Sequence, residues 1–281
     1  MADYSWAIPV MRAGYAGRGV TYLAVAGLSL WALFHGGEAE GTGEALRSLS
    51  DSGWGTFVLW LIALGLFAYT VWRGIDAVED LEEYGSDAKG MIARAGMITT
   101  GLAHGAIAGL AISLAMGRGG SGGSEGGDGG GVQSVTGKIL SWPGGVWIVG
   151  IAALCTIGAG IYYLIKGWKS KYREKLLANK FTRNYDWMLK AGVMAQGALI
   201  LIVGGFLLTA AIRNDPEQAG GAGQAFDWVA SLPGGNILII LLCLGLLAFA
   251  FFCFVNAVYR IVPRVAGGKL TSLAAKLKAM A

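Results

Sequence analysis

Uncharged and mostly apolar stretches recur six times along the chain. None contains Asp, Glu, Lys or Arg, and each approaches or exceeds the ~18 to 20 residues that a helix needs to cross a bilayer. Backbone groups in lipid must be satisfied within the segment, so each stretch predicts a transmembrane helix. The expected helices cover about 19–37, 54–73, 94–117, 144–166, 190–212 and 236–259.

The overall composition agrees with an all-α membrane protein. Only 14% of the 281 residues are charged, whereas soluble domains carry about 25%. The strand-like alternation of an outer-membrane barrel is absent. The first residues lack the short apolar core and cleavage site of a signal peptide, so we expect the first helix to remain in the protein.

Basic residues divide unevenly among the predicted loops. If the N-terminus is inside, the inner segments hold 18 of the 22 Lys and Arg residues, and the outer loops hold the other four. Basic residues favour the cytoplasmic side. We therefore expect both termini in the cytoplasm.

The loop between the fourth and fifth predicted helices combines basic and aromatic residues. Its aromatic side chains suit a segment in the headgroup region, although nucleic-acid binders share this composition. Because membrane spans flank the loop, anionic lipids of the inner leaflet are the expected partner, and no nucleic acid is expected. The aromatic residues are Trp168, Tyr172, Tyr185 and Trp187.

A motif recurs at the start of the odd-numbered helices. It has a basic residue, Ala-Gly, a glycine at the eighth position and another glycine eight residues later. The copies are 12–19 with Gly27, 94–101 with Gly109, and 190–197 with Gly205. The even-numbered helices repeat more loosely, as Gly65, Tyr69 and Arg73; Gly158, Tyr162 and Lys166; and Gly245, Phe249 and Cys253.

These matches predict three tandem two-helix repeats at 9–90, 91–180 and 187–262, followed by a basic cytoplasmic tail at 263–281. Each repeat has two spans, so all three start on the same side of the membrane and are parallel. The simplest arrangement is a pseudo-threefold ring of six helices about the membrane normal. Its centre either encloses an axial cavity or is packed shut.

The repeated R-A-G-x-x-x-x-G motif, its second glycine and the Pro-Gly-Gly before later even-numbered helices resemble a bacterial membrane family. This family is catalogued as domain of unknown function 1206, a two-helix unit that occurs three times per chain. The resemblance covers about 9–262. It departs at the Gly-rich insertion 119–131 and at Lys190, which replaces arginine. It implies the topology, the repeat number and a bacterial cytoplasmic membrane, and carries over no activity or catalytic residue.

Polar residues at matching repeat positions form a candidate axial layer. Such residues in spans usually face a bundle interior or a cavity. The layer lies ~9 Å of helix rise beyond the basic start of each repeat, in the inner half of the membrane. Alternatively, the arginine extends to the headgroups and the threonine bonds its own helix. The members are Arg18, Thr100 and Gln196, with Tyr22 and His104 one turn further.

Basic and small residues supply two further predictions. Arg12, Arg94 and Lys190 start the repeats, and either form a basic inner entrance that attracts anions or anchor to lipid phosphates. Glycines at four-residue spacing let helices approach closely. We expect helix packing at Gly27, Gly101, Gly105, Gly109 and Gly205.

The sequence predicts no metal, cofactor or enzyme activity. His35 and His104 are the only histidines, and ~20 Å of helix rise separates their repeat positions, too far for one haem iron. No nucleophile, base and oxyanion site assembles. The acidic residues 76–83 are expected to form a solvated helix end.

The favoured function is binding or passage of a small polar or anionic solute, or an ion, along the pseudo-threefold axis. The alternative is an accessory or structural subunit that binds another membrane complex or lipids. Abundant small residues, aromatic belts and the lack of carboxylates in the predicted spans motivate the alternative.

Overall fold

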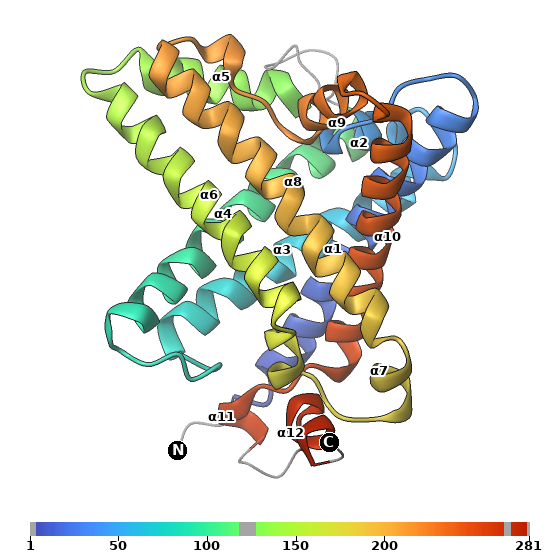
Figure 1. Ribbon diagram of the computed structural model, residues 1–281, viewed down its shortest axis with the longest axis vertical. Helices are drawn as coiled ribbons and strands as arrows, with labels where there is room; N and C mark the ends of the chain where they lie inside the picture. Colours follow the sequence, from blue (N-terminus) through green and yellow to red (C-terminus); the bar gives the residue numbers. More distant parts are fainter. Residues whose placement is uncertain (1–3, 118–127, 267–270, 280–281) are drawn as a thin grey trace.

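The computed structural model describes residues 4–117, 128–266 and 271–279, which contain six helices long and apolar enough to span a membrane. The expectation of an all-helical protein with six apolar spans is confirmed (Figure 1). Part of the Gly-rich insertion, 119–127, lies outside the described residues. The long helices are α1 (Ala7–Phe34), α3 (Gly55–Glu79), α4 (Ala88–Ala115), α6 (Gly145–Trp168), α8 (Asp186–Arg213) and α10 (Gly235–Tyr259).

Two helices extend well beyond their uncharged stretches. Helix α1 begins at Ala7 rather than near 19, and α3 continues to Glu79 rather than ending near 73. A search for uncharged windows stops at the first charge, but a helix continues wherever its charged side chains find partners. These extensions place Arg18 and Arg73 inside long helices.

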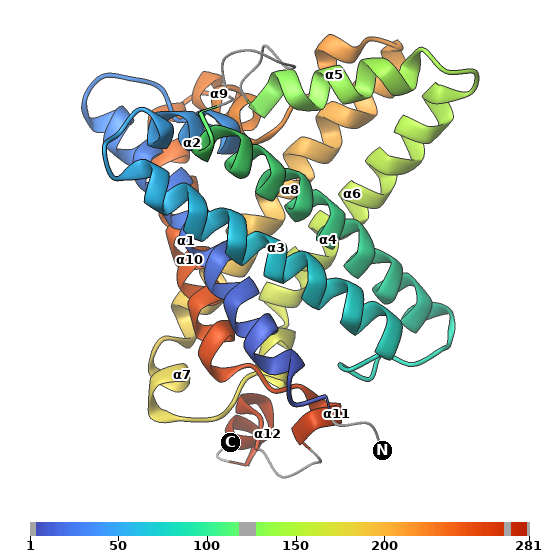
Figure 2. The same ribbon diagram turned by 180° about the vertical axis from the view of Figure 1, so that it is seen from behind.

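The long helices pack in the order α4, α3, α1, α10, α8 and α6. Contacts between repeats join α3 to α4, α6 to α8 and, from the third repeat to the first, α10 to α1. Within the first and third repeats, α1 packs on α3 and α8 packs on α10. Among the described residues, α4 and α6 of the middle repeat do not form such a packed pair. Opposite views show the α3–α4 pair crossing the α6–α8 pair, with the two pairs separating towards both ends (Figures 1 and 2).

The contact between the two long helices of a repeat, here called its seam, depends on small residues. A Cβ atom added at Gly65 of α3 would lie 2.4 Å from the Cα of Gly17 on α1, and one added at Gly245 of α10 would lie 2.4 Å from the Cβ of Ala195 on α8. Such spacing lets helix backbones meet. At the matching position in the middle repeat, Gly158 of α6, an added Cβ would have no heavy atom within 4 Å.

The glycines predicted to pack divide into two groups. Added Cβ atoms at Gly101 and Gly105 would lie 3.1 Å and 3.2 Å from side-chain atoms of α3, so these glycines lie at the α3–α4 contact. Gly27, Gly109 and Gly205 have no heavy atom within 4 Å of that position, and the packing prediction is wrong for them. The eight-residue recurrence marks a repeat position but does not show which helix face meets a neighbour.

Three short helices lie across one end of the bundle, here called the cap end. They are α2 (Thr42–Ser50), α5 (Asp128–Leu140) and α9 (Ala222–Ser231), one between the long helices of each repeat, and they contact one another. The 3₁₀ helix η2 (Pro216–Gln218) precedes α9. Backbone N–H groups of Gly41 and Gly221 donate to Glu44 and Gln224 at distances of 2.9 Å, which stabilises the starts of α2 and α9.

The opposite end carries the start of α1 and the last helices of the chain, and is here called the terminal end (Figure 1). Its short elements are η1 (Lys171–Lys175), α7 (Lys180–Asn184), α11 (Pro263–Ala266) and α12 (Leu273–Lys278). The Leu177 N–H donates to the Tyr259 carbonyl, and the Ile261 N–H to the Lys175 carbonyl, each at 2.9 Å. These bonds tie the loop after α6 to the chain after α10.

Candidate functional site: a buried cation–aromatic centre

Arg18 on α1 lies at the centre of the bundle. It is 3% exposed. Its Nη1 donates to the hydroxyl of Tyr69 on α3 at 3.0 Å. Its guanidinium carbon lies 4.7 Å from the Tyr69 ring centroid, 5.3 Å from that of Phe249 and 5.7 Å from that of Tyr22. Aromatic faces attract cations by up to ~2 kcal/mol when both are desolvated, which holds the side chain inside rather than at the headgroups.

The Tyr69 hydroxyl accepts hydrogen bonds from two guanidinium groups. Arg73, one turn further along α3, donates from Nε to the same oxygen at 2.8 Å and from Nη2 to the Tyr15 hydroxyl at 3.2 Å. Tyr15 and Tyr69 pack edge to face with centroids 5.5 Å apart. Two positive charges therefore share one neutral oxygen.

Carboxylates pair with Arg73 but leave Arg18 without a counter-charge. Arg73 lies 3.4 Å from Asp76, and Asp76 accepts a bond of 3.1 Å from the Glu82 N–H. Glu82 in turn accepts bonds of 2.8 Å and 2.5 Å from Arg260. In the described part of the chain, Arg18 belongs to no ion pair.

The expectation of a solvated acidic helix end is wrong for two of its residues. Asp76 is 0% exposed and Glu82 is 1% exposed. Burial by itself raises the pKa of Glu82, but the charges of Arg260, Arg73 and Lys175 outweigh burial and lower this pKa to about 2. Asp76 pairs with Arg73 on its own helix, whereas Glu82 pairs with Arg260 from a distant part of the chain, a contact that the local charge pattern does not reveal.

The structure brings four of the five predicted layer residues together. Gln196 on α8 donates from Nε2 to the Tyr22 hydroxyl at 2.9 Å, beside Arg18. The His104 ring lies 4.9 Å from the Tyr69 ring, and its Nδ1 donates to the Thr100 carbonyl at 2.7 Å.

Thr100 instead bonds its own helix, as the alternative hypothesis expected. Its hydroxyl donates to the Gly96 carbonyl of its own helix at 2.7 Å.

Two buried polar atoms of this centre have no hydrogen-bond partner: Nε of Arg18 and Oε1 of Gln196. Orphaned polar atoms are rare in protein interiors and are costly. One is a donor and the other an acceptor, and both side chains contact Tyr22. Their chemistry suits a ligand that both accepts and donates hydrogen bonds.

The three basic residues predicted to form an entrance have separate surroundings. Arg94 donates to the Ala77 and Val78 carbonyls at the end of α3, at 2.5 Å and 2.9 Å. The Lys190 ammonium lies 5.5 Å from the Trp168 ring centroid. Arg12 is exposed. Among the described residues, no contact joins the three.

Sequence analysis did not assign a site role to Tyr69, Arg73, Glu82 or Arg260. The recurrence of an aromatic and a basic residue four positions apart on α3 and α6 was an available signal. The Glu82–Arg260 pair, 178 positions apart, left no such signal. No group of His, Cys, Asp and Glu side chains that could hold a metal ion occurs in the part of the chain described.

The apolar helices and repeated contacts define a multi-pass helical membrane protein with internal repeats. The chain belongs to the family described as Domain of Unknown Function (DUF1206), whose unit matches residues 13–80, 95–170 and 191–260. The chain is 25% identical over 253 residues to the uncharacterized protein YxxB of Bacillus subtilis (strain 168), covering 89% of this chain and 90% of that one. No solved structure shows a significant match.

Proposed function

We propose that this membrane protein binds a small anion at the cation–aromatic centre around Arg18. The observation that carries the proposal is a guanidinium that is 3% exposed, has no carboxylate partner and retains an unbonded Nε. An arginine stays charged in proteins, and burying an uncompensated charge costs several kcal/mol. An ionisable residue inside a membrane span is by default a functional candidate.

The two orphaned atoms narrow the class of ligand. Arg18 Nε needs an acceptor, and Gln196 Oε1 needs a donor. A partly protonated oxyanion such as hydrogen phosphate, or a carboxylate that also carries a hydroxyl, supplies both. A bare halide satisfies only the arginine.

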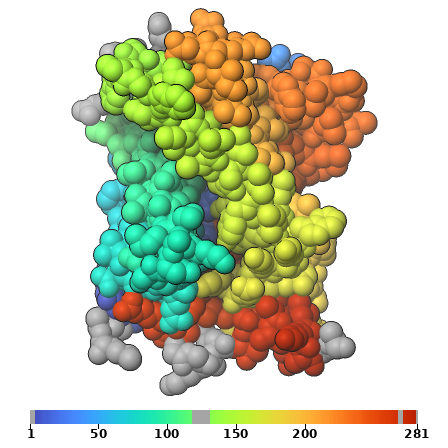
Figure 3. All heavy atoms as spheres, turned by 60° about the vertical axis from the view of Figure 1, so that its left-hand side comes forward, coloured from blue at the N-terminus to red at the C-terminus, as the bar shows by residue number. Residues whose placement is uncertain are grey.

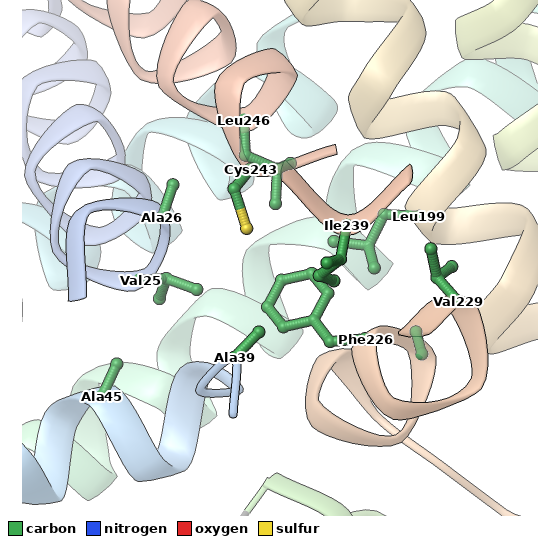
Figure 4. Close-up of a cluster of buried hydrophobic side chains, with 11 residues drawn as sticks. Val25, Ala26, Ala39, Ala45, Leu199, Phe226, Val229, Ile239, Cys243 and Leu246 are labelled. Atoms are coloured by element: carbon green, nitrogen blue, oxygen red, sulfur yellow. The ribbon is translucent and has the colours of Figure 1, made fainter. Parts of the chain in front are cut away.

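Binding is better supported than passage along the axis. Beneath the cap end, Val25, Phe226, Ile239 and Leu246 belong to one cluster of buried apolar side chains (Figure 4). Buried apolar side chains disfavour the passage of an anion. We therefore restrict the proposal to binding.

Orientation and symmetry are part of the same proposal. The uneven distribution of basic residues supports a terminal end that faces the cytoplasm. The three contacts between successive repeats, α3–α4, α6–α8 and α10–α1, support a pseudo-threefold relation about the membrane normal. We further propose that the site binds its ligand without transforming it.

The direct test uses inorganic phosphate and purified protein in a neutral detergent. Ligand at ~100 times its dissociation constant stabilises the native state by ~2.7 kcal/mol, which a thermal melt detects as a rise in Tm. We expect phosphate to raise the Tm of the wild-type protein and of Lys171→Gln, a matched control that removes an exposed charge. We expect no rise for Arg18→Gln.

Two results contradict the proposal. One is a phosphate-dependent rise that persists in Arg18→Gln. The other is no rise with phosphate or with a hydroxycarboxylate such as lactate in wild-type protein. Sodium chloride at matched ionic strength separates binding from charge screening.

A further inference from the structure

The middle repeat differs from its neighbours at its seam, the contact between its two long helices. In the first repeat an added Cβ at Gly14 would lie 2.6 Å from the Tyr69 backbone, and in the third one at Gly192 would lie 2.5 Å from the Phe249 backbone. At the equivalent Gly96, no heavy atom lies within 4 Å. The seam between α4 and α6 is therefore open.

The residue that fills the other two seams is half-exposed here. Tyr69 and Phe249 are each 0% exposed, whereas Tyr162 at the same repeat position is 48% exposed. A space-filling view shows a recess between the α4 and α6 columns, with deep-blue atoms from the first part of the chain at its base (Figure 3). The opening thus leads from the lipid side towards α1, the helix that carries Arg18.

A basic residue stands on this open seam. Lys166 lies one turn beyond Tyr162 on α6, at the repeat position that Arg73 occupies on α3. Its ammonium lies 5.8 Å from the Tyr162 ring centroid and 5.5 Å from that of Tyr163. It belongs to none of the ion pairs that the described structure contains.

The electrostatic surroundings of Lys166 are mixed but predominantly positive. Its neighbour Tyr163 packs with its ring centroid 6.3 Å from that of Phe249, which contacts Arg18, and Arg73, Arg260 and the carboxylate of Glu82 lie in the same region. Glu82 is already bonded to Arg260 at 2.5 Å. A basic residue beside two aromatic rings, in the region of the unpaired Arg18, is a suitable partner for an anionic group that enters the opening.

The depth of Lys166 matches that of a lipid headgroup. It lies two residues before the end of α6 at Trp168, and Trp168 is 71% exposed, as expected for an aromatic side chain at the membrane interface. Above it, Ile98 and Leu102 on α4 and Ile161 on α6 are exposed. These surfaces are apolar, as acyl chains require.

We propose that the α4–α6 seam holds an anionic phospholipid that enters sideways from the inner leaflet, with its phosphate between Lys166 and the Arg18 centre. This inference rests on the proposed function, because it makes the lipid phosphate the anion that the centre receives. Charge complementarity selects this occupant: a neutral transmembrane helix leaves both cations uncompensated, and a zwitterionic lipid compensates them less fully.

The test is native mass spectrometry of protein extracted from nanodiscs that contain equal amounts of phosphatidylglycerol and phosphatidylcholine. We expect one phosphatidylglycerol to be retained by the wild-type protein. Lys166→Gln should reduce that retention about fivefold to tenfold, as for the loss of ~1 kcal/mol or slightly more. Lys171→Gln is the matched control and should retain the lipid.

A second variant tests the seam without removing a charge. An added Cβ at Gly158 has open space around it, so Gly158→Leu fills the seam while leaving the packed helix contacts intact. It should lose the lipid and keep the wild-type response to inorganic phosphate.

Each contrary result has a distinct meaning. Equal retention of both lipids, or retention by Gly158→Leu, overturns the seam as a phospholipid site. A stoichiometric protein in place of the lipid also overturns it and favours an accessory subunit. If Arg18→Gln abolishes the response to phosphate but the wild-type protein retains no lipid, the proposed function stands and only the phospholipid proposal is wrong. If phosphate and phosphatidylglycerol both fail to bind, both proposals are wrong.

Discussion

The first and middle repeats use similar residues to reach different packing. In the first, Gly17 and Gly65 bring α1 and α3 so close that an added Cβ would lie 2.4 Å from the partner backbone. In the middle repeat, Gly158 keeps its place, but Thr99 stands where the first repeat has Gly17. Thr99 is exposed and donates to the Ala95 carbonyl of its own helix. One larger side chain at a position that needs a small one is consistent with an open seam.

A repeated motif therefore specifies a position and not a contact. The aromatic side chain and the basic residue after Gly65 become a buried centre because α1 covers them. Their counterparts after Gly158 remain accessible because α4 does not. The chain thus carries one closed and one open version of the same surface.

The largest loss of stability should follow from breaking the buried charge network of the first repeat. Arg260→Ala leaves the Glu82 carboxylate buried without its main partner, and removing one member of a buried ion pair costs ~3 to 5 kcal/mol. Chemical denaturation in detergent should show this loss. Lys171→Ala, which removes an exposed charge, should lie within ~0.5 kcal/mol of wild type. Equal stability of both variants contradicts the network.

Acid should weaken the same network in a defined window. The pKa of Glu82 is lowered to about 2 in the folded protein, from an ordinary value of ~4.3. Its stabilisation is therefore present above pH ~4.3 and is lost as the pH falls towards 2, by ~3 kcal/mol. Denaturation midpoints should fall over this window in wild type and fall less in Glu82→Gln. Parallel pH profiles contradict the assignment.

Matched glycine substitutions compare the two seams directly. Gly65→Ala forces a Cβ against the α1 backbone and should cost ~1.5 kcal/mol, within the range for overpacking. Gly158→Ala meets open space and should change stability by less than ~0.5 kcal/mol. Thermal melts of both variants, purified in the same detergent, check this. Equal losses show that α4 and α6 are packed.

Gln196→Leu should change stability only slightly but should weaken ligand binding. The side chain makes one bond to Tyr22 and leaves its oxygen unpaired, so an apolar replacement should cost less than ~1 kcal/mol. The rise in Tm with phosphate should nevertheless shrink, because the ligand loses an acceptor. Thr100→Val, whose hydroxyl bonds only its own helix, should keep the full rise. A full rise in Gln196→Leu removes this residue from the site.

Periodicity and charge predicted the six helices because hydrocarbon demands long uncharged helices. The repeat register also brought Arg18, Tyr22 and Gln196 into one predicted layer, and the structure places them together. The rest depends on contacts between distant residues. Glu82 looks solvated in sequence until Arg260 is placed beside it, and the open α4–α6 seam follows from helix packing that the motif does not encode.

The most direct test of the account is an electron cryo-microscopy structure in nanodiscs containing phosphatidylglycerol, with an antibody fragment bound for size. We expect α4 and α6 to stand apart, with two-tailed density between them whose headgroup lies near Lys166, towards Arg18. A structure in which Gly96 packs against Tyr162 and the seam is closed, with no density beside Arg18, contradicts it.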